Sequence, residues 1–100
     1  AVALVVPVAA CGTKVDHVKR AKDFAAQKKY KEATLEYRAA LQEDDRNGAI
    51  RLALGDAYAA LGDTRNALLQ YEECLARYPR AWNSAEVRRR VERLRREKRL

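Results

Sequence analysis

The chain has 100 residues, of which 48% are hydrophobic and 35% charged, so it can bury the core of one small domain. With 4 glycines and 2 prolines, collagen-like and low-complexity classes are excluded, and good helix formers predominate. Two cysteines exclude a disulfide-dense scaffold and a structural zinc site with four cysteine ligands. The chain also has a single histidine and neither a G-x-x-x-x-G-K nor a G-x-G-x-x-G motif, so we expect no metal, no cofactor and no enzymatic activity.

The net charge of +7 is unevenly distributed along the chain. Residues 80–100 hold nine basic and three acidic residues, whereas residues 14–79 hold twelve and eleven. The basic character therefore belongs to the C-terminal end. A patch of this kind favours acidic partners, such as nucleic acid, anionic lipid or an acidic protein surface.

Residues 1–10 read AVALVVPVAA and carry no charge. This run is too short to span a bilayer, which takes about 20 apolar residues, but it has the length of the apolar region of a secretory signal. The alternative is a buried strand or helix of the domain. The lack of polar alternation and the abrupt start of charge at Lys14 argue against that alternative.

The residues VAACG at positions 8–12 resemble the lipobox of bacterial lipoproteins. This resemblance implies a partial lipoprotein signal peptide over residues 1–10, lipidation of Cys11, and a short linker over residues 11–13. It also implies a membrane-anchored protein of the bacterial cell envelope that faces the periplasm. Gly12, where an aspartate often marks retention at the inner membrane, slightly favours the outer membrane.

The residues that follow repeat with a period of 34, because residues 14–47 align with residues 48–81 without a gap. In the first copy, the pattern predicts helices over about 14–27 and 31–43, with lysines at 28 and 29 in place of the glycine turn of the second copy. The same-class matches are Ala21 with Gly55, Phe24 with Tyr58, Ala33 with Ala67, Leu35 with Leu69, Tyr37 with Tyr71, Ala40 with Cys74, and Leu41 with Leu75.

The second copy shows the apolar spacing of two helices. Gly62 is expected to end the first helix, Asp63 to cap the second, and Pro79 to stop it. Cys74 is expected to be a small core residue and not a nucleophile. The first stripe comprises Ile50, Leu54, Ala57, Tyr58 and Leu61, and the second comprises Ala67, Leu68, Tyr71, Cys74, Leu75 and Tyr78.

Leu54-Gly55-x-x-Tyr58, Ala67-x-x-x-Tyr71 and Pro79 together resemble the tetratricopeptide repeat (TPR). The first copy carries the weaker Arg20-Ala21-x-x-Phe24 and Ala33-x-x-x-Tyr37. The resemblance implies an all-α solenoid with TPR-like repeats over 14–47 and 48–81, and a basic capping helix over 82–100. It also implies a groove for a segment of another protein. The implied groove residues are Val18, Lys19 and Lys22 in the first copy, and Leu52, Asp56 and Ala59 in the second.

The last helix is expected over about residues 84–99, with a narrow apolar stripe at Val87, Val91 and Leu94. One interpretation is a solvated cap, supported by the pairs Glu86–Arg90 and Glu92–Arg96. The other is a surface for an anionic partner, for which the candidate residues are Arg88, Arg89, Arg95 and Arg96. His17 is expected to be a solvated surface residue.

The expected function is a membrane-anchored scaffold for protein–protein interaction in an envelope assembly, secretion or polysaccharide system. Self-association into a homo-oligomer is compatible with this, since two repeats are fewer than the three usually needed for stability. The alternative is that the basic helix binds anionic lipid or nucleic acid, although a secreted lipoprotein would meet no cellular RNA. An accessory subunit of an enzyme complex, or a groove without a dedicated ligand, also remains open.

Overall fold

The computed structural model describes residues 15–99, which form five α-helices without any strand. This confirms the expected all-α class. The predicted signal segment, the linker and Cys11 lie outside the described residues. The helices are α2 (His17–Ala26), α3 (Tyr30–Glu43), α4 (Gly48–Ala60), α5 (Thr64–Arg77) and α6 (Ser84–Arg99).

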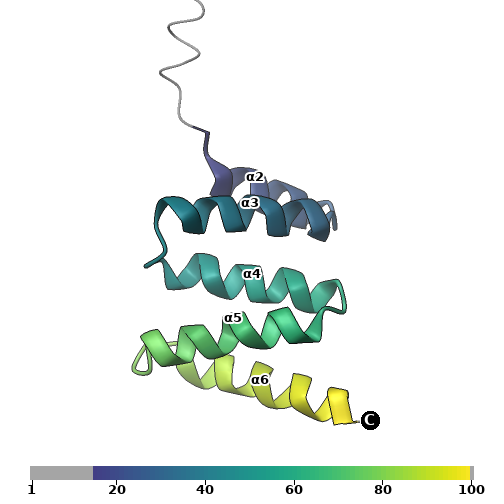
Figure 1. The fold of residues 1–100 in the computed structure, drawn as a ribbon, viewed down its shortest axis with the longest axis vertical. Helices are drawn as coiled ribbons and strands as arrows, with labels where there is room; N and C mark the ends of the chain where they lie inside the picture. Colours follow the sequence, from purple (N-terminus) through teal and green to yellow (C-terminus); the bar gives the residue numbers. More distant parts are fainter. Residues whose placement is uncertain (1–14, 100) are drawn as a thin grey trace, which may run out of the picture.

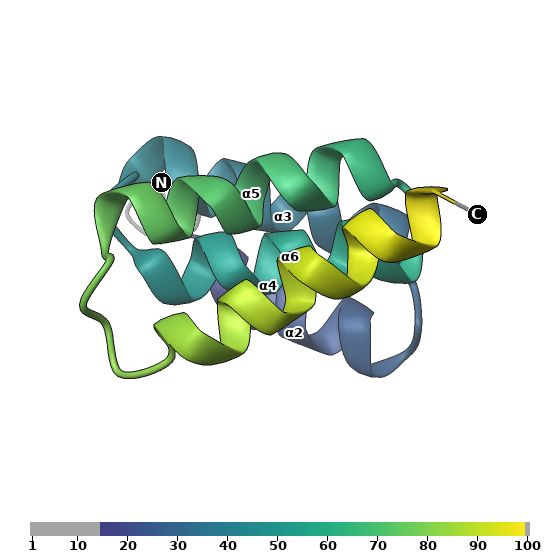
Figure 2. The same cartoon turned by 90° about the horizontal axis from the view of Figure 1, so that it is seen from below.

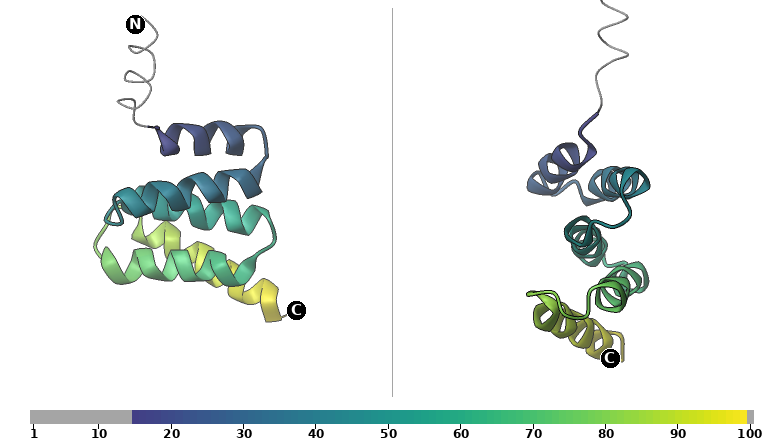
Figure 3. Two further views of the ribbon diagram at one scale, coloured as in Figure 1. Left: turned by 45° about the horizontal axis from the view of Figure 1, so that its top comes forward. Right: turned by 90° about the vertical axis from the view of Figure 1, so that its left-hand side faces the viewer.

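Each helix packs on the next one along the chain. The end-on view in Figure 3 shows two layers, with α2, α4 and α6 on one side and α3 and α5 on the other. Successive helices run in alternating directions, so the amino ends of α2, α4 and α6 lie at the same edge (Figure 1). Seen from below, α6 lies obliquely across the helices behind it (Figure 2).

The buried side chains form two clusters, one around the first three helices and one around the last two. Leu61 was predicted to lie on the buried stripe of α4, and that prediction is wrong: Leu61 is the C-cap residue and is exposed. The first cluster comprises Ala21, Ala33, Tyr37, Ala40, Ile50, Leu54 and Ala57. The second comprises Ala67, Leu68, Tyr71, Cys74, Val87 and Val91.

The turns after α2 and α4 share a set of backbone hydrogen bonds at positions 34 residues apart. The Lys29 amide donates to the carbonyl of Phe24 at 2.8 Å, and the Asp63 amide donates to the carbonyl of Tyr58 at 2.9 Å. Both turns need a residue with positive φ, which is 61° at Lys28 and 80° at Gly62. The two lysines therefore replace a glycine turn in sequence without changing its geometry.

The residue types at these two turns predict opposite effects on stability. Replacing Lys28 with glycine should raise the free energy of unfolding by up to about 1 kcal/mol, because glycine adopts positive φ without steric cost. Replacing Gly62 with alanine should lower it by about 1–2 kcal/mol for the converse reason. Urea unfolding followed by circular dichroism measures both. If both changes altered the free energy of unfolding in the same direction, the positive φ of Lys28 would not be a source of backbone strain.

Candidate functional site: two pockets beside helix α6

The amino end of α4 is fixed by a cap and by a contact with α5. The Asn47 side chain accepts a hydrogen bond from the Ile50 amide at 3.2 Å, which satisfies a free backbone donor of the first turn. The Cys74 thiol of α5 lies 3.7 Å from the Gly48 carbonyl, to which it donates. Cys74 is buried, as predicted, and burial raises the pKa of its thiol.

The loop between α3 and α4 is held against the end of α5. The Arg77 guanidinium contacts the Glu73 carboxylate at 2.6 Å and the Asp45 carboxylate at 3.8 Å. The Tyr78 hydroxyl donates to the carbonyl of Arg46. The contacts of Arg77 with Asp45 and of Tyr78 with Arg46 join residues 32 apart, and the Tyr78 ring lies beside Gly48.

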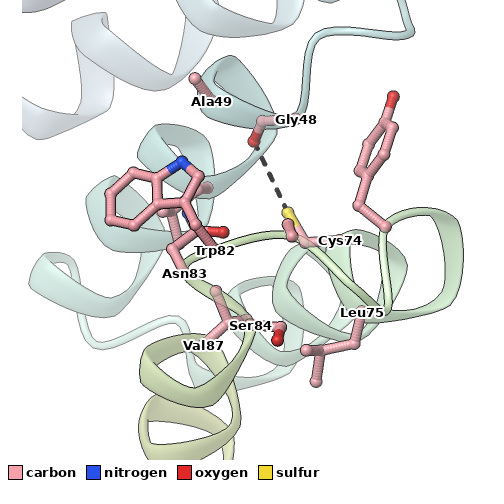
Figure 4. A pocket seen from close by; sticks show the side chains of 11 residues that line it. Gly48, Ala49, Cys74, Leu75, Trp82, Asn83, Ser84 and Val87 are labelled. Carbon is pink, nitrogen blue, oxygen red and sulfur yellow. Dashed lines mark hydrogen bonds between the residues drawn. The ribbon is translucent and has the colours of Figure 1, made fainter.

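An apolar pocket of about 190 Å³ opens between the amino ends of α4 and α6 and the carboxyl end of α5. Trp82, in the loop before α6, lies at this pocket and is 95% exposed (Figure 4). An exposed indole of this kind is unusual on a folded surface, because tryptophan is mostly buried on average. The lining residues are Gly48, Ala49, Leu52, Cys74, Leu75, Tyr78, Ala81, Trp82, Asn83, Ser84 and Val87.

Sequence reasoning missed this pocket and gave Trp82 no role. The available signal was the chain's single tryptophan, placed in a short loop directly after Pro79. A tryptophan in such a loop has no helical stripe to join, so it does not contribute to a periodic core pattern. The pocket forms where α6 packs against the other helices, and the spacing of apolar residues in the sequence does not predict that position.

A second pocket, of about 320 Å³, lies farther along α4 and α6 and is charged. The Tyr71 hydroxyl donates to the Asp56 carboxylate, and the Arg90 guanidinium lies 3.4 Å from the same oxygen. Burial, together with the hydrogen bond to Asp56, raises the pKa of the Tyr71 phenol. The lining residues are Asp56, Ala59, Ala60, Tyr71, Arg90, Arg93, Leu94 and Glu97.

No protein-family model and no curated protein matches this chain. Within residues 15–99, no cluster of three or more histidine, cysteine or carboxylate side chains is arranged to hold a metal ion. None of the helices in that part of the chain has both the length and the apolar character needed to cross a bilayer.

The predicted groove residues fall into two groups. Leu52 lines the apolar pocket, whereas Asp56 and Ala59 line the charged one. In α2, Val18 packs against the first cluster, and Lys19 and Lys22 are exposed. These three residues line neither pocket, so the α4 half of the predicted groove is the part that meets α6.

The four predicted patch arginines point to two sides of α6, since residues seven apart share a helix face and neighbours do not. Arg95 pairs with Glu72 of α5 at 2.9 Å, and Arg88 lines the same shallow depression as Arg95. Arg89 pairs with Glu86 at 2.5 Å, and Arg96 lies on this other side.

The two ion pairs expected along α6 have different outcomes. Glu86–Arg90 is present at 4.0 Å. Glu92–Arg96 is absent from the ion pairs of the described residues, although both side chains line one shallow depression on α6. Of the two ion pairs that supported the interpretation of α6 as a solvated capping helix, the structure therefore contains one.

The expectation that His17 is a solvated surface residue is wrong. Its side chain is half-buried, and its Nδ1 lies 2.7 Å from the Glu36 carboxylate of α3. The Arg20 guanidinium lies 3.4 Å from the same carboxylate. His17 and Arg20 are thus bound to a partner far along the sequence and serve to hold α2 against α3.

Proposed function

We propose that this chain is a membrane-tethered protein-binding module, built from two TPR-type repeats and a terminal helix, that acts as a scaffold in a bacterial envelope system. The recurrence of buried and exposed positions supports the repeats. Ala33 and Ala67 are both fully buried, whereas Leu35 and Leu69 are 59% and 57% exposed. The backbone hydrogen bonds that the two turns share at positions 34 residues apart support them as well.

The observation that carries the binding function is Trp82 beside the apolar pocket. Tryptophan is enriched among the residues that dominate protein–protein affinity, and such residues pair with well-packed pockets. An exposed indole contributes little to the core, so its position is better explained by a partner than by folding. Replacing Trp82 with serine should accordingly change the free energy of unfolding by less than about 0.5 kcal/mol.

Site-specific photocrosslinking in bacterial membranes tests this function. A photoreactive phenylalanine derivative replaces Trp82 in one variant and the exposed Leu35, on the opposite layer, in a control variant. We expect one discrete crosslinked protein from position 82 that is absent from position 35. The same products from both positions, or none from either, would contradict a binding site at Trp82. The identity of the captured protein separates a scaffold from an accessory subunit of an enzyme complex.

The tether rests on the lipobox-like residues 8–12 and is tested on its own. Expressed behind a complete signal peptide, the protein should begin at Cys11 and carry added acyl mass in mass spectrometry. Replacing Cys11 with alanine should abolish that addition. A mature chain that retains residues 1–10 without modification would contradict lipidation and leave the binding function untouched.

The second candidate function is attachment of α6 to an anionic membrane surface. It is favoured by the absence of a carboxylate within ion-pair distance of Arg93, Arg96 and Lys98, among the described residues. Near a membrane, each basic residue contributes about 1 kcal/mol of attraction to anionic lipid. Co-sedimentation with anionic vesicles at low salt tests it, and a chain that stays in the supernatant excludes it.

A further inference from the structure

Both pockets are lined by residues of α4 and α6, and together they form one seam between these helices. The two helices run in the same direction (Figure 1). Ala49 and Leu52 line the apolar pocket near the amino ends, and Ala59 lines the charged pocket near the carboxyl ends. Ten residues separate Ala49 from Ala59, which corresponds to about 15 Å along a helix. The seam thus offers two neighbouring binding positions of different chemistry.

The apolar position is suited to one side chain. Its volume of about 190 Å³ is below the range of about 300–1,000 Å³ typical of pockets for whole small molecules. Its walls are apolar at Ala49, Leu52 and Val87, and the exposed Trp82 lines it as well. One large aliphatic or aromatic side chain, covered by the indole, would bury apolar surface on both sides.

The charged position favours acidic groups. Asp56 already accepts a hydrogen bond from Tyr71 and pairs with Arg90, so its charge is balanced within the chain. Arg93 lines the charged pocket and also the neighbouring depression that holds Arg96. Neither Arg93 nor Arg96 pairs with a carboxylate in the described part of the chain. Glu97 lines the charged pocket, and Glu86 and Glu92 line the depression, but none of the ion pairs of the described residues joins them to Arg93 or Arg96. Residues 80–100 hold nine basic residues against three acidic ones, so two adjacent guanidinium groups on this helix are complementary to carboxylates.

We propose that the α4–α6 seam binds an acidic segment of another protein. One large apolar side chain of that segment occupies the pocket beside Trp82, and its carboxylates contact Arg93 and Arg96. This inference rests on the proposed protein-binding function and adds the chemistry of the partner. A second copy of this chain fits less well, because its net charge is +7 and the same cations would approach each other.

Selection from a random peptide library displayed on phage tests the proposal with the full chain as bait. We expect the bound pool to be enriched in aspartate and glutamate, together with one large apolar residue. Because the chain contains a single tryptophan, a bound peptide should shift the fluorescence emission of Trp82 to shorter wavelength. The affinity should fall as salt is added, since screening weakens exposed charge pairs.

Variants then separate the two binding positions, with the anisotropy of a labelled peptide from the pool as the readout. Replacing Trp82 with serine should weaken binding about thirtyfold or more. Replacing Arg93 or Arg96 with glutamine should weaken it about two- to fivefold each. Arg95→Gln is the matched control, because it removes the same charge from the other side of α6, and should leave the affinity unchanged.

Four outcomes would overturn the proposal. One is a pool without acidic enrichment, and another is an equal loss of affinity for Arg95→Gln and Arg93→Gln. A third is a shift of Trp82 emission that anionic vesicles, or a higher concentration of the protein, produce in the absence of peptide. The fourth is a library that yields no binder. In each case a specific crosslink from position 82 would show that the protein-binding function stands and that only the chemistry of the partner is wrong.

Discussion

Replacing Tyr71 with alanine is expected to lower the free energy of unfolding by about 3–5 kcal/mol. Tyr71 is 2% exposed and belongs to the second buried cluster. Its ring lies against Gly55 and its hydroxyl donates to Asp56, so the change opens a cavity and removes a hydrogen bond together. Since small domains are stable by about 5–15 kcal/mol, this loss is a large share of the total free energy of unfolding.

The measurement is urea unfolding followed by far-ultraviolet circular dichroism. Tryptophan fluorescence is a poor probe here, because Trp82 is exposed in the folded state as well. Leu69→Ala on the same helix is the control, and its exposed side chain should cost less than about 0.5 kcal/mol. Tyr71→Phe should cost about 1 kcal/mol, since it removes only the hydrogen bond. A cost below about 1 kcal/mol for Tyr71→Ala would mean that its ring does not fill the core.

The helices could be predicted because their signals are local. The spacing of Ala67, Tyr71 and Cys74 marks one face of a helix, and the structure buries all three. Gly62 and Asp63 act as the expected helix end and cap, with Asp63 accepting from the Asn66 amide at 3.1 Å. Such signals need only a few neighbouring residues, so they are readable without knowledge of the tertiary packing.

The candidate site could not be predicted in the same way, because it depends on contacts between distant segments. Leu52 and Asp56 were expected to line an open groove, and the packing of α6 places them in separate pockets instead. Arg88 and Arg89 were grouped by charge alone, although they lie on different sides of the helix. His17 was misjudged because its partner, Glu36, is 19 residues away.

The position of Gly55 in the interior of α4 makes a second large effect testable. Glycine inside a helix costs about 1 kcal/mol relative to alanine, so Gly55→Ala would be stabilising on propensity alone. A Cβ at Gly55, however, would lie 2.6 Å from Cε1 of Tyr71 and 2.8 Å from its Cδ1. Real Cβ contacts are not this short, and the Tyr71 ring is too buried to move aside freely. Overpacking of this kind costs about 1–3 kcal/mol and offsets the gain.

We therefore expect Gly55→Ala to destabilise the native chain by up to about 2 kcal/mol and to stabilise the Tyr71→Ala variant by up to about 1 kcal/mol. The sign reverses because removal of the Tyr71 ring removes the clash and leaves the gain in helix propensity. A double-mutant cycle from four urea titrations measures the coupling between the two positions. Additive effects would show that Gly55 is present for a reason other than the close approach of the Tyr71 ring.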